Sequence, residues 1–117
     1  FWGPWCPPCL AEMEPLKELR KKYSTDDIVF ISICRNDDRK QYKQVLDKYG
    51  MYVDGIEHIH ADDLQAESQV HKMYNQLNID GIPYFFIINR EGVIVNYGSM
   101  MRPSYPGTAE CIEEWLK

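Results

Sequence analysis

Apolar residues recur along the chain at two spacings, one typical of helices and one typical of buried strands. Repeats of three and four residues predict four amphipathic helices. Pro15 falls inside the first of them, which is expected to run to about Tyr23. Because proline cannot donate a hydrogen bond to the residue four positions earlier, we expect this helix to bend near Ala11. The apolar residues that mark the four helices are Leu10, Met13, Leu16, Leu19 and Tyr23; Tyr42, Val45, Leu46 and Tyr49; Val70, Met73, Tyr74 and Leu77; and Thr108, Cys111, Ile112 and Trp115.

The second helix has signals at both ends. Asn36, Asp37 and Asp38 are suitable N-caps, and Gly50 stands where a glycine C-cap is expected.

Runs rich in β-branched and aromatic residues predict the strands. Residues 27–33 are nearly continuous in apolar character, which is typical of a parallel strand that is buried on both faces. Residues 55–60 form a shorter candidate strand. Residues 84–89 and 93–97 flank an Arg-Glu-Gly turn and are expected to form an antiparallel hairpin. Residues 100–107 contain prolines and are interpreted as a surface loop.

The order of these elements predicts an α/β protein, a three-layer sandwich in which a mixed sheet carries helices on both faces. A chain of 117 residues with 44% hydrophobic residues fits a single domain, 1–117. Phe1 and Trp2 resemble the end of a strand whose earlier residues are absent. We therefore expect a truncated N-terminal strand and a fragment of a longer protein.

Composition narrows the function. A net charge of -5 and a pI near 5.1 argue against a nucleic-acid partner, because no basic stripe is present to neutralise phosphates. No apolar run is long enough to span a bilayer, so a membrane tether could lie only in a region before Phe1. Four cysteines are too few for a disulfide-stapled miniprotein and indicate one functional pair plus two others.

The candidate functional pair is Cys6 and Cys9, in the run Phe-Trp-Gly-Pro-Trp-Cys-Pro-Pro-Cys at positions 1–9. This spacing at the start of a helix lets the two sulfurs form a disulfide and points the first thiol at the unpaired N–H groups of the helix. A cysteine pKa lowered from about 8.5 to roughly 3.5–7.5 produces a nucleophile at neutral pH. Cys6 is therefore the candidate attacking thiol and Cys9 the resolving thiol.

A lone Cys-x-x-Cys is also half of a zinc site. A second such pair or two histidines at ligand spacing would be needed, and only His58 and His60 come near this requirement. They alternate along a strand and so share one face. We interpret them as polar residues of an edge strand and expect no metal site.

The motif and the Gly-Ile-Pro at residues 81–83, which precedes an apolar hairpin, resemble the thioredoxin superfamily. Within it the chain is similar to the TlpA/ResA/DsbE-like thiol:disulfide oxidoreductases, and Cys-Pro-Pro-Cys with the later Arg-Pro-Ser (residues 102–104) resembles those of Bacteroidetes. The resemblance implies a thioredoxin-like fold, a redox-active disulfide, and no metal or organic cofactor.

The resemblance also assigns roles by position. Cys6 matches the family's nucleophile, Cys9 its resolving cysteine, and Trp5 the aromatic residue that shields the pair. Pro83 matches the cis-proline that faces the disulfide. The backbone of Ile82 would then pair with an extended substrate segment.

Three further residues complete the expected site. Glu12 matches an acidic residue near the active site and is a candidate for proton transfer with Cys9. Pro7 and Pro8 lie between the sulfurs, where they contact substrate and influence the reduction potential. The helix proline stands six residues after Cys9, where the superfamily commonly has it at five, so the bend can differ. The buried acid of thioredoxins would fall before Phe1.

The expected function is disulfide exchange with protein substrates, as a reductase in the bacterial periplasm or on the outer face of a membrane. A membrane thiol donor would reset the pair, and cytochrome c biogenesis is one implied setting. An oxidant or isomerase, a peroxidase and a non-catalytic binding module at Ile82 and Pro83 remain alternatives. Cys34 is interpreted as an inert core thiol or part of a regulatory pair, and Cys111 as a packing residue.

Overall fold

The computed structural model describes residues 1–34, 39–60 and 72–117. Residues 72–76 are helical and match the third expected helix. The described residues do not include Val70 of that helix, His71, or the N-cap candidates Asn36, Asp37 and Asp38. The other elements are, in chain order, α1 (Pro7–Leu10), α2 (Met13–Lys21), β1 (Phe30–Cys34), α3 (Arg39–Lys48), β2 (Ile56–His60), β3 (Phe85–Ile88), β4 (Ile94–Gly98), the 3-10 helix η1 (Ser99–Met101) and α5 (Pro106–Leu116).

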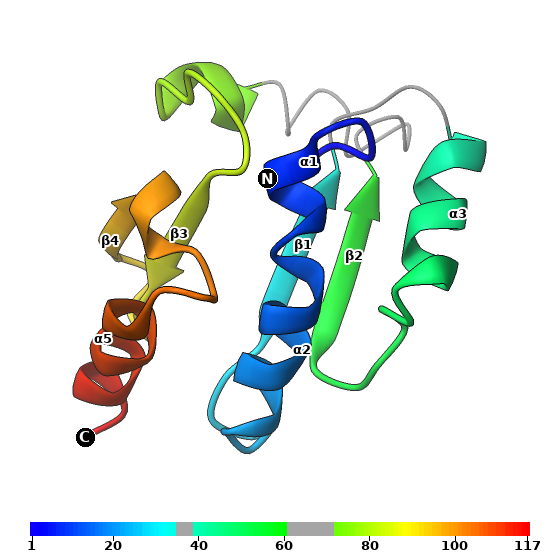
Figure 1. Ribbon diagram of the computed structural model, residues 1–117. Helices are drawn as coiled ribbons and strands as arrows, with labels where there is room; N and C mark the ends of the chain where they lie inside the picture. Colours follow the sequence, from blue (N-terminus) through cyan, green and yellow to red (C-terminus); the bar gives the residue numbers. More distant parts are fainter. Residues whose placement is uncertain (35–38, 61–71) are drawn as a thin grey trace.

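The strands form two pairs (Figure 1). Backbone contacts of the first two residues of the chain join these pairs. β1 and β2 are parallel, and β3 and β4 form the expected antiparallel hairpin. Phe1 exchanges two backbone hydrogen bonds with Tyr84, at 2.8 and 3.1 Å. Trp2 forms a parallel bridge with Cys34, and its N–H donates to the Ile33 carbonyl at 3.0 Å. The mixed sheet therefore consists of a parallel half and an antiparallel half that meet at Phe1 and Trp2.

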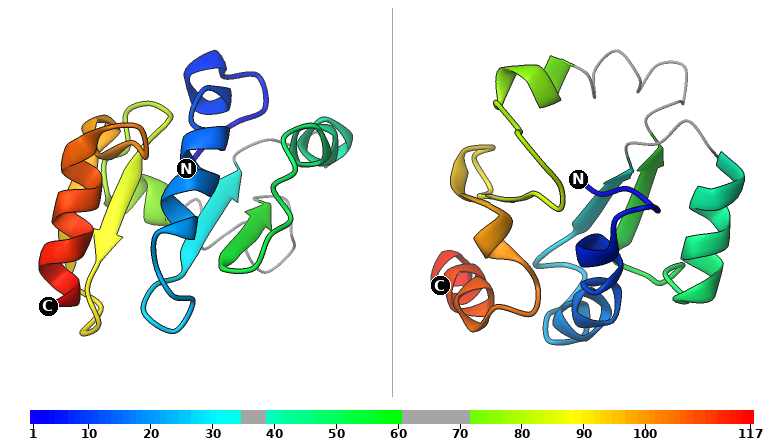
Figure 2. Two further views of the ribbon diagram at one scale, coloured as in Figure 1. Left: turned by 60° about the horizontal axis from the view of Figure 1, so that its bottom comes forward. Right: turned by 45° about the horizontal axis from the view of Figure 1, so that its top comes forward.

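Helical segments lie on both faces of these strands (Figure 2). On one face, Phe1 and Ile33 pack with Ile59, and the Phe1 ring meets the Tyr74 ring edge-on at 6.0 Å. The opposite face carries the larger core, to which α1, α2 and α3 contribute. This core consists of Trp2, Cys6, Cys9, Met13, Cys34, Tyr42, Val45, Leu46, Met51 and Ile56. The expected α/β arrangement is confirmed.

The first helix is broken where Pro15 predicts a bend. α1 ends at Leu10 and α2 begins at Met13. The last backbone hydrogen bonds before the break run from Ala11 N–H to the Pro7 carbonyl at 3.0 Å and from Glu12 N–H to the Cys9 carbonyl at 3.1 Å. α2 then ends at Lys21, slightly before the expected end at Tyr23.

The C-terminus of α3 confirms the glycine cap. Gly50 has φ +61°, a left-handed conformation that glycine adopts without steric cost. Met51 N–H donates to the Leu46 carbonyl at 2.9 Å, and Gly50 N–H donates to the Asp47 carbonyl at 3.2 Å. This pair of bonds is a Schellman motif.

Two expected boundaries are wrong. The strand expected at 27–33 begins only at Phe30, because the N–H groups of Asp27 and Ile28 donate to the Ser24 carbonyl and close a turn. It is also not buried on both faces along its length, since Ile31 is 57% exposed. Residues 100–107, expected to be a loop, include the end of η1 and the start of α5.

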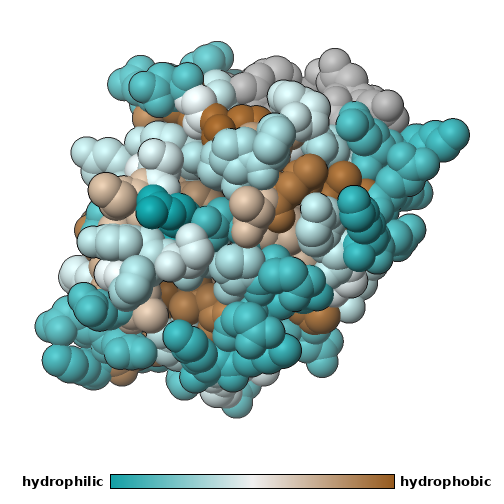
Figure 3. Space-filling view, viewed as in Figure 1, coloured by the Kyte–Doolittle hydropathy of each residue, from teal (hydrophilic) through white to brown (hydrophobic). Residues whose placement is uncertain are grey.

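Polar side chains cover most of the face seen in Figure 1, and apolar side chains gather between α1 and α3 and between α2 and α5 (Figure 3). In the part of the chain that the structure describes, no helix combines the length and apolar character needed to cross a bilayer.

Substituting Gly55 by alanine is expected to destabilise the fold more than the same change at Gly92. Both glycines have positive φ, +89° and +81°, so each alanine pays the left-handed penalty of roughly 1–2 kcal/mol. A Cβ at Gly55 would also collide with the side chain of Arg20, whose Nε donates to the Asp54 carbonyl at 2.7 Å, whereas a Cβ at Gly92 meets nothing within 4 Å. Urea unfolding of both variants measures the difference. Equal losses would contradict the collision.

Candidate active site

Cys6 and Cys9 form a disulfide at the start of α1, with their Cα atoms 5.2 Å apart. Cys6 is the N-cap residue of the helix, and Cys9 lies in its first turn. Both are largely buried, at 7% and 3% exposure, and both belong to the main core. The two cysteines that the sequence predicts as a functional pair are thus bonded to each other and packed in the main core.

The first turn of α1 provides a local hydrogen-bond donor for Cys6. Pro7 and Pro8 have no N–H, so the first amide of the helix is that of Cys9, and it donates to Cys6 Sγ at 3.3 Å. α1 has only four residues, which makes its macrodipole small. The Cys9 amide, rather than a long helix dipole, is therefore what favours a thiolate on reduced Cys6.

Ile82 and Pro83 form the facing wall of the site. Their peptide bond is cis, as the resemblance implied. The carbonyl oxygen of Ile82 lies 3.8 Å from Cys6 Sγ, and the side chain of Ile82 packs against the core that contains both cysteines. The structure therefore brings residues 76 positions apart in sequence to the disulfide.

Trp5 is 54% exposed beside the pair. A Cβ built on Gly3 would lie 2.6–2.8 Å from three atoms of the Trp5 ring. The indole thus rests against the backbone of Gly3, where any larger side chain would displace it. Shielding of the sulfurs by Trp5 stays a prediction.

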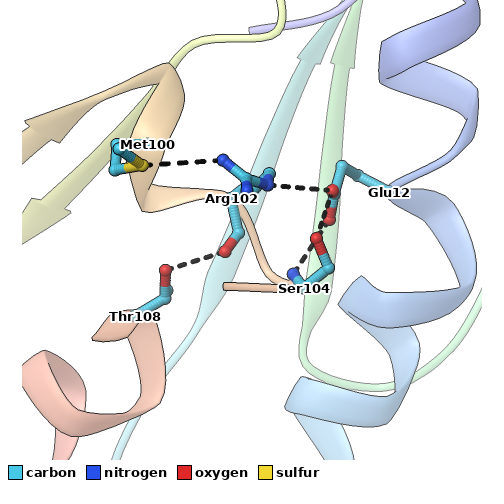
Figure 4. Close-up of polar contacts among 5 residues, drawn as sticks. All are labelled: Glu12, Met100, Arg102, Ser104 and Thr108. Atoms are coloured by element: carbon cyan, nitrogen blue, oxygen red, sulfur yellow. Dashed lines mark hydrogen bonds and ion pairs between the residues drawn. The ribbon is translucent and has the colours of Figure 1, made fainter. Parts of the chain in front are cut away.

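Glu12 lies at the break between α1 and α2, and its carboxylate faces the turn at residues 102–104 (Figure 4). Ser104 Oγ donates to Oε1 at 2.6 Å, and Ser104 N–H donates to Oε2 at 3.0 Å. Arg102 Nε lies 3.9 Å from Oε1. Proton transfer between Glu12 and Cys9 stays a prediction. The sequence predicts no role for Ser104. Its place in the Arg-Pro-Ser motif is the signal that could have identified it.

The two histidines on β2 have separate surroundings. His58 Nε2 lies 2.8 Å from the Met51 carbonyl oxygen. His60 is 1% exposed and packs against the Tyr42 ring at 4.5 Å. Across residues 1–34, 39–60 and 72–117, no group of three His, Cys, Asp or Glu side chains is placed to hold a metal ion.

The other two cysteines are not in disulfides. Cys34 is fully buried in the core that includes Cys6 and Cys9. Cys111 is partly buried, and Asn96 Nδ2 lies 3.8 Å from its sulfur.

Replacing Pro8 by alanine is expected to lower the pKa of reduced Cys6, because it adds an N–H donor for the thiolate. The new amide stands at the second helical position, from which an N–H reaches the N-cap side chain. Pro7→Ala is the matched control, because an amide at the first helical position does not point at that side chain. The rate of Cys6 alkylation as a function of pH measures both values. An equal shift in the two variants would refute this reading.

The fold and the cysteine pair define a thioredoxin-like protein, and comparison with known proteins agrees. Residues 1–94 match the family model described as thioredoxin-like. The chain therefore belongs to the thioredoxin-like family.

Proteins of similar sequence are named thiol-disulfide oxidoreductases. The thiol-disulfide oxidoreductase ResA of Bacillus thuringiensis (strain Al Hakam) is 25% identical over 95 residues, which cover 81% of this chain and 49% of that protein. The ResA of Halalkalibacterium halodurans is 26% identical over 122 residues, covering 100% and 58%. The chain thus spans about half the length of the curated relatives that it matches.

A solved structure supports the fold. A Chlorobium tepidum protein named as a thiol:disulfide interchange protein DsbE superimposes with a TM-score of 0.67 at 16% identity, over 99% of this chain and 73% of that one. The thioredoxin-like fold expected from the sequence is confirmed.

Proposed function

We propose that this protein is a thiol:disulfide oxidoreductase that exchanges disulfides with protein substrates through Cys6 and Cys9. The observation that carries the proposal is the Cys6–Cys9 disulfide at the start of α1, with Cys6 Sγ 3.8 Å from the backbone of Ile82. An extended substrate segment could pair with this backbone beside Pro83 in the manner of an added strand.

The exchange proceeds in two successive thiol–disulfide exchange reactions. The thiolate of reduced Cys6 attacks a substrate disulfide, forming a Cys6–substrate disulfide and releasing one substrate thiolate. Cys9 then loses its proton and attacks Cys6 Sγ, which forms the Cys6–Cys9 disulfide and releases the second substrate thiolate. The two released thiolates take up protons. The substrate gains two electrons, and the protein loses two.

We further propose that the protein acts as a reductase on the outer side of a bacterial membrane, in the periplasm where one exists. Resemblance to the TlpA/ResA/DsbE-like proteins supports this direction and place. A disulfide cycle is also easier to sustain outside the reducing cytosol. A membrane thiol donor would return Cys6 and Cys9 to the dithiol, and apocytochromes are one candidate substrate class.

Three measurements test the proposal: reduction of insulin disulfides, the redox potential and the pKa of Cys6. The reduced protein should reduce insulin disulfides. Redox equilibration with glutathione should place its potential near that of thioredoxin, about -270 mV, whereas an oxidant would lie near about -120 mV. The function is refuted if insulin is not reduced and the pKa of Cys6 lies near the unperturbed value of about 8.5. A high potential with active exchange would refute only the direction.

A further inference from the structure

Ala11 and Glu12 form a hinge between α1 and α2, and the backbone of this hinge contacts Cys9. α1 has four residues, too few for a helix to be stable by itself. Glu12 N–H donates to the Cys9 carbonyl at 3.1 Å, so the backbone of the hinge holds Cys9 directly. Pro15 has no N–H and cannot stiffen the hinge by donating to the Ala11 carbonyl. Whatever fixes Glu12 therefore also restrains the resolving cysteine, in addition to its packing in the core.

The Glu12 side chain is fixed from outside the helix (Figure 4). Each of its carboxylate oxygens accepts one hydrogen bond from Ser104, one from the hydroxyl and one from the backbone N–H. The side chain is only 12% exposed, and the Arg102 guanidinium lies 3.9 Å away. Two bonds from one residue hold both the position and the rotation of the carboxylate.

The turn that carries Ser104 is itself anchored to α5. Tyr105 N–H donates to the Arg102 carbonyl at 3.0 Å, and Thr108 Oγ1 donates to the same carbonyl at 2.7 Å. Thr108 is a residue of α5 and is 4% exposed. The turn with Ser104 is thus held in place by α5, and Ser104 in turn holds the Glu12 carboxylate through two hydrogen bonds.

We propose that Ser104, acting through the Glu12 carboxylate, is a positioning residue for the Cys6–Cys9 pair. The proposal rests on the proposed function and assigns Ser104 to its second step. In that step the deprotonated Cys9 attacks Cys6 Sγ, the Cys6–substrate bond breaks, and the substrate thiolate leaves and is protonated. A fixed hinge keeps Cys9 close to Cys6, which raises its effective concentration for this attack and favours the closed disulfide.

Ser104→Ala, Glu12→Gln and the double variant test the proposal with two readouts. The first is the equilibrium constant for Cys6–Cys9 disulfide formation against glutathione. The second uses dithiobis-nitrobenzoate, which releases one coloured thiolate when Cys6 attacks and another when Cys9 resolves the mixed disulfide. Ser104→Ala should lower the constant about threefold to tenfold, a potential about 15 to 30 mV less negative, and slow the second release by a similar factor. Glu12→Gln should act in the same direction, and the double variant should match the larger single effect.

Three controls separate positioning from general stability. Ser104→Thr keeps both donors and should behave as the unmodified protein. Ser99→Ala makes the serine-to-alanine change at an exposed position of η1, and Gly92→Ala destabilises the fold without touching the hinge. Neither should change either readout.

The proposal is overturned if Ser104→Ala leaves both readouts unchanged or if the two single effects add fully in the double variant. An effect of Glu12→Gln alone would overturn it too, and would mean that Glu12 acts on Cys9 directly. Both readouts are independent of a protein substrate. Failure to reduce insulin together with an unperturbed pKa of Cys6 would therefore refute the proposed function while the role of Ser104 is still decided.

Discussion

Replacing Cys9 by serine is expected to stop exchange after its first step and to trap substrate proteins on Cys6. The resolving thiol acts from within the same chain, with an effective concentration that can exceed about 10⁵ M, so its loss should slow release of the substrate by at least about a thousandfold. Cys6 keeps its amide donor from residue 9 and should still attack. Non-reducing gel electrophoresis and mass spectrometry would detect the mixed disulfides.

Cys6→Ser is the matched variant and should form no adducts, because the nucleophile is absent. Cys111→Ser should leave exchange unchanged, since that thiol is not in the disulfide. Adducts that form equally well in Cys6→Ser would show that the attacking thiol has been assigned to the wrong residue.

Leu46→Ala is expected to destabilise the fold by about 3 kcal/mol, within the roughly 2–5 kcal/mol typical of buried leucines. Leu46 is 1% exposed and packs in the core shared by Trp2, Cys9 and Cys34. A cavity at this point removes contacts between α3 and the face of the sheet that carries the cysteine helix. Such a loss is large relative to the roughly 5–15 kcal/mol by which domains are stable. Urea unfolding of the oxidised protein measures it.

Val93→Ala serves as the comparison, because Val93 is 54% exposed and its truncation should cost less than about 0.5 kcal/mol. Similar losses at the two positions would mean that Leu46 does not lie in the main core.

Signals that act through a residue's own backbone were predictable from the sequence. Pro15 removes an N–H from its helix, Gly50 tolerates positive φ, and Gly92, at φ +81°, closes the hairpin turn. Each feature appears where the sequence predicts it. The start of β1 was not predictable from apolar character, because Ser24 accepts hydrogen bonds from residues 26, 27 and 28 and holds them in a turn.

The residues of the candidate site were likewise predictable only where a local sequence signal exists. The motif places Cys6 and Cys9 correctly at one helix start, and the Gly-Ile-Pro signal locates the cis bond at Pro83. The partner of Glu12 could not be derived, because Ser104 lies 92 residues away. No local rule predicts which turn a carboxylate meets when the contact depends on the packing of two distant helices.

The site joins segments that are far apart in the sequence, and this has a consequence during synthesis. Cys6 precedes Ile82 by 76 residues, and Phe1 precedes Tyr84 by 83. At about 5–20 residues per second, the two thiols are made roughly 4 to 15 s before the wall that faces them. During that interval the nascent chain carries both cysteines but lacks the residues that face them in the candidate active site. Any selectivity that depends on Ile82 and Pro83 therefore begins only after these two residues have been made.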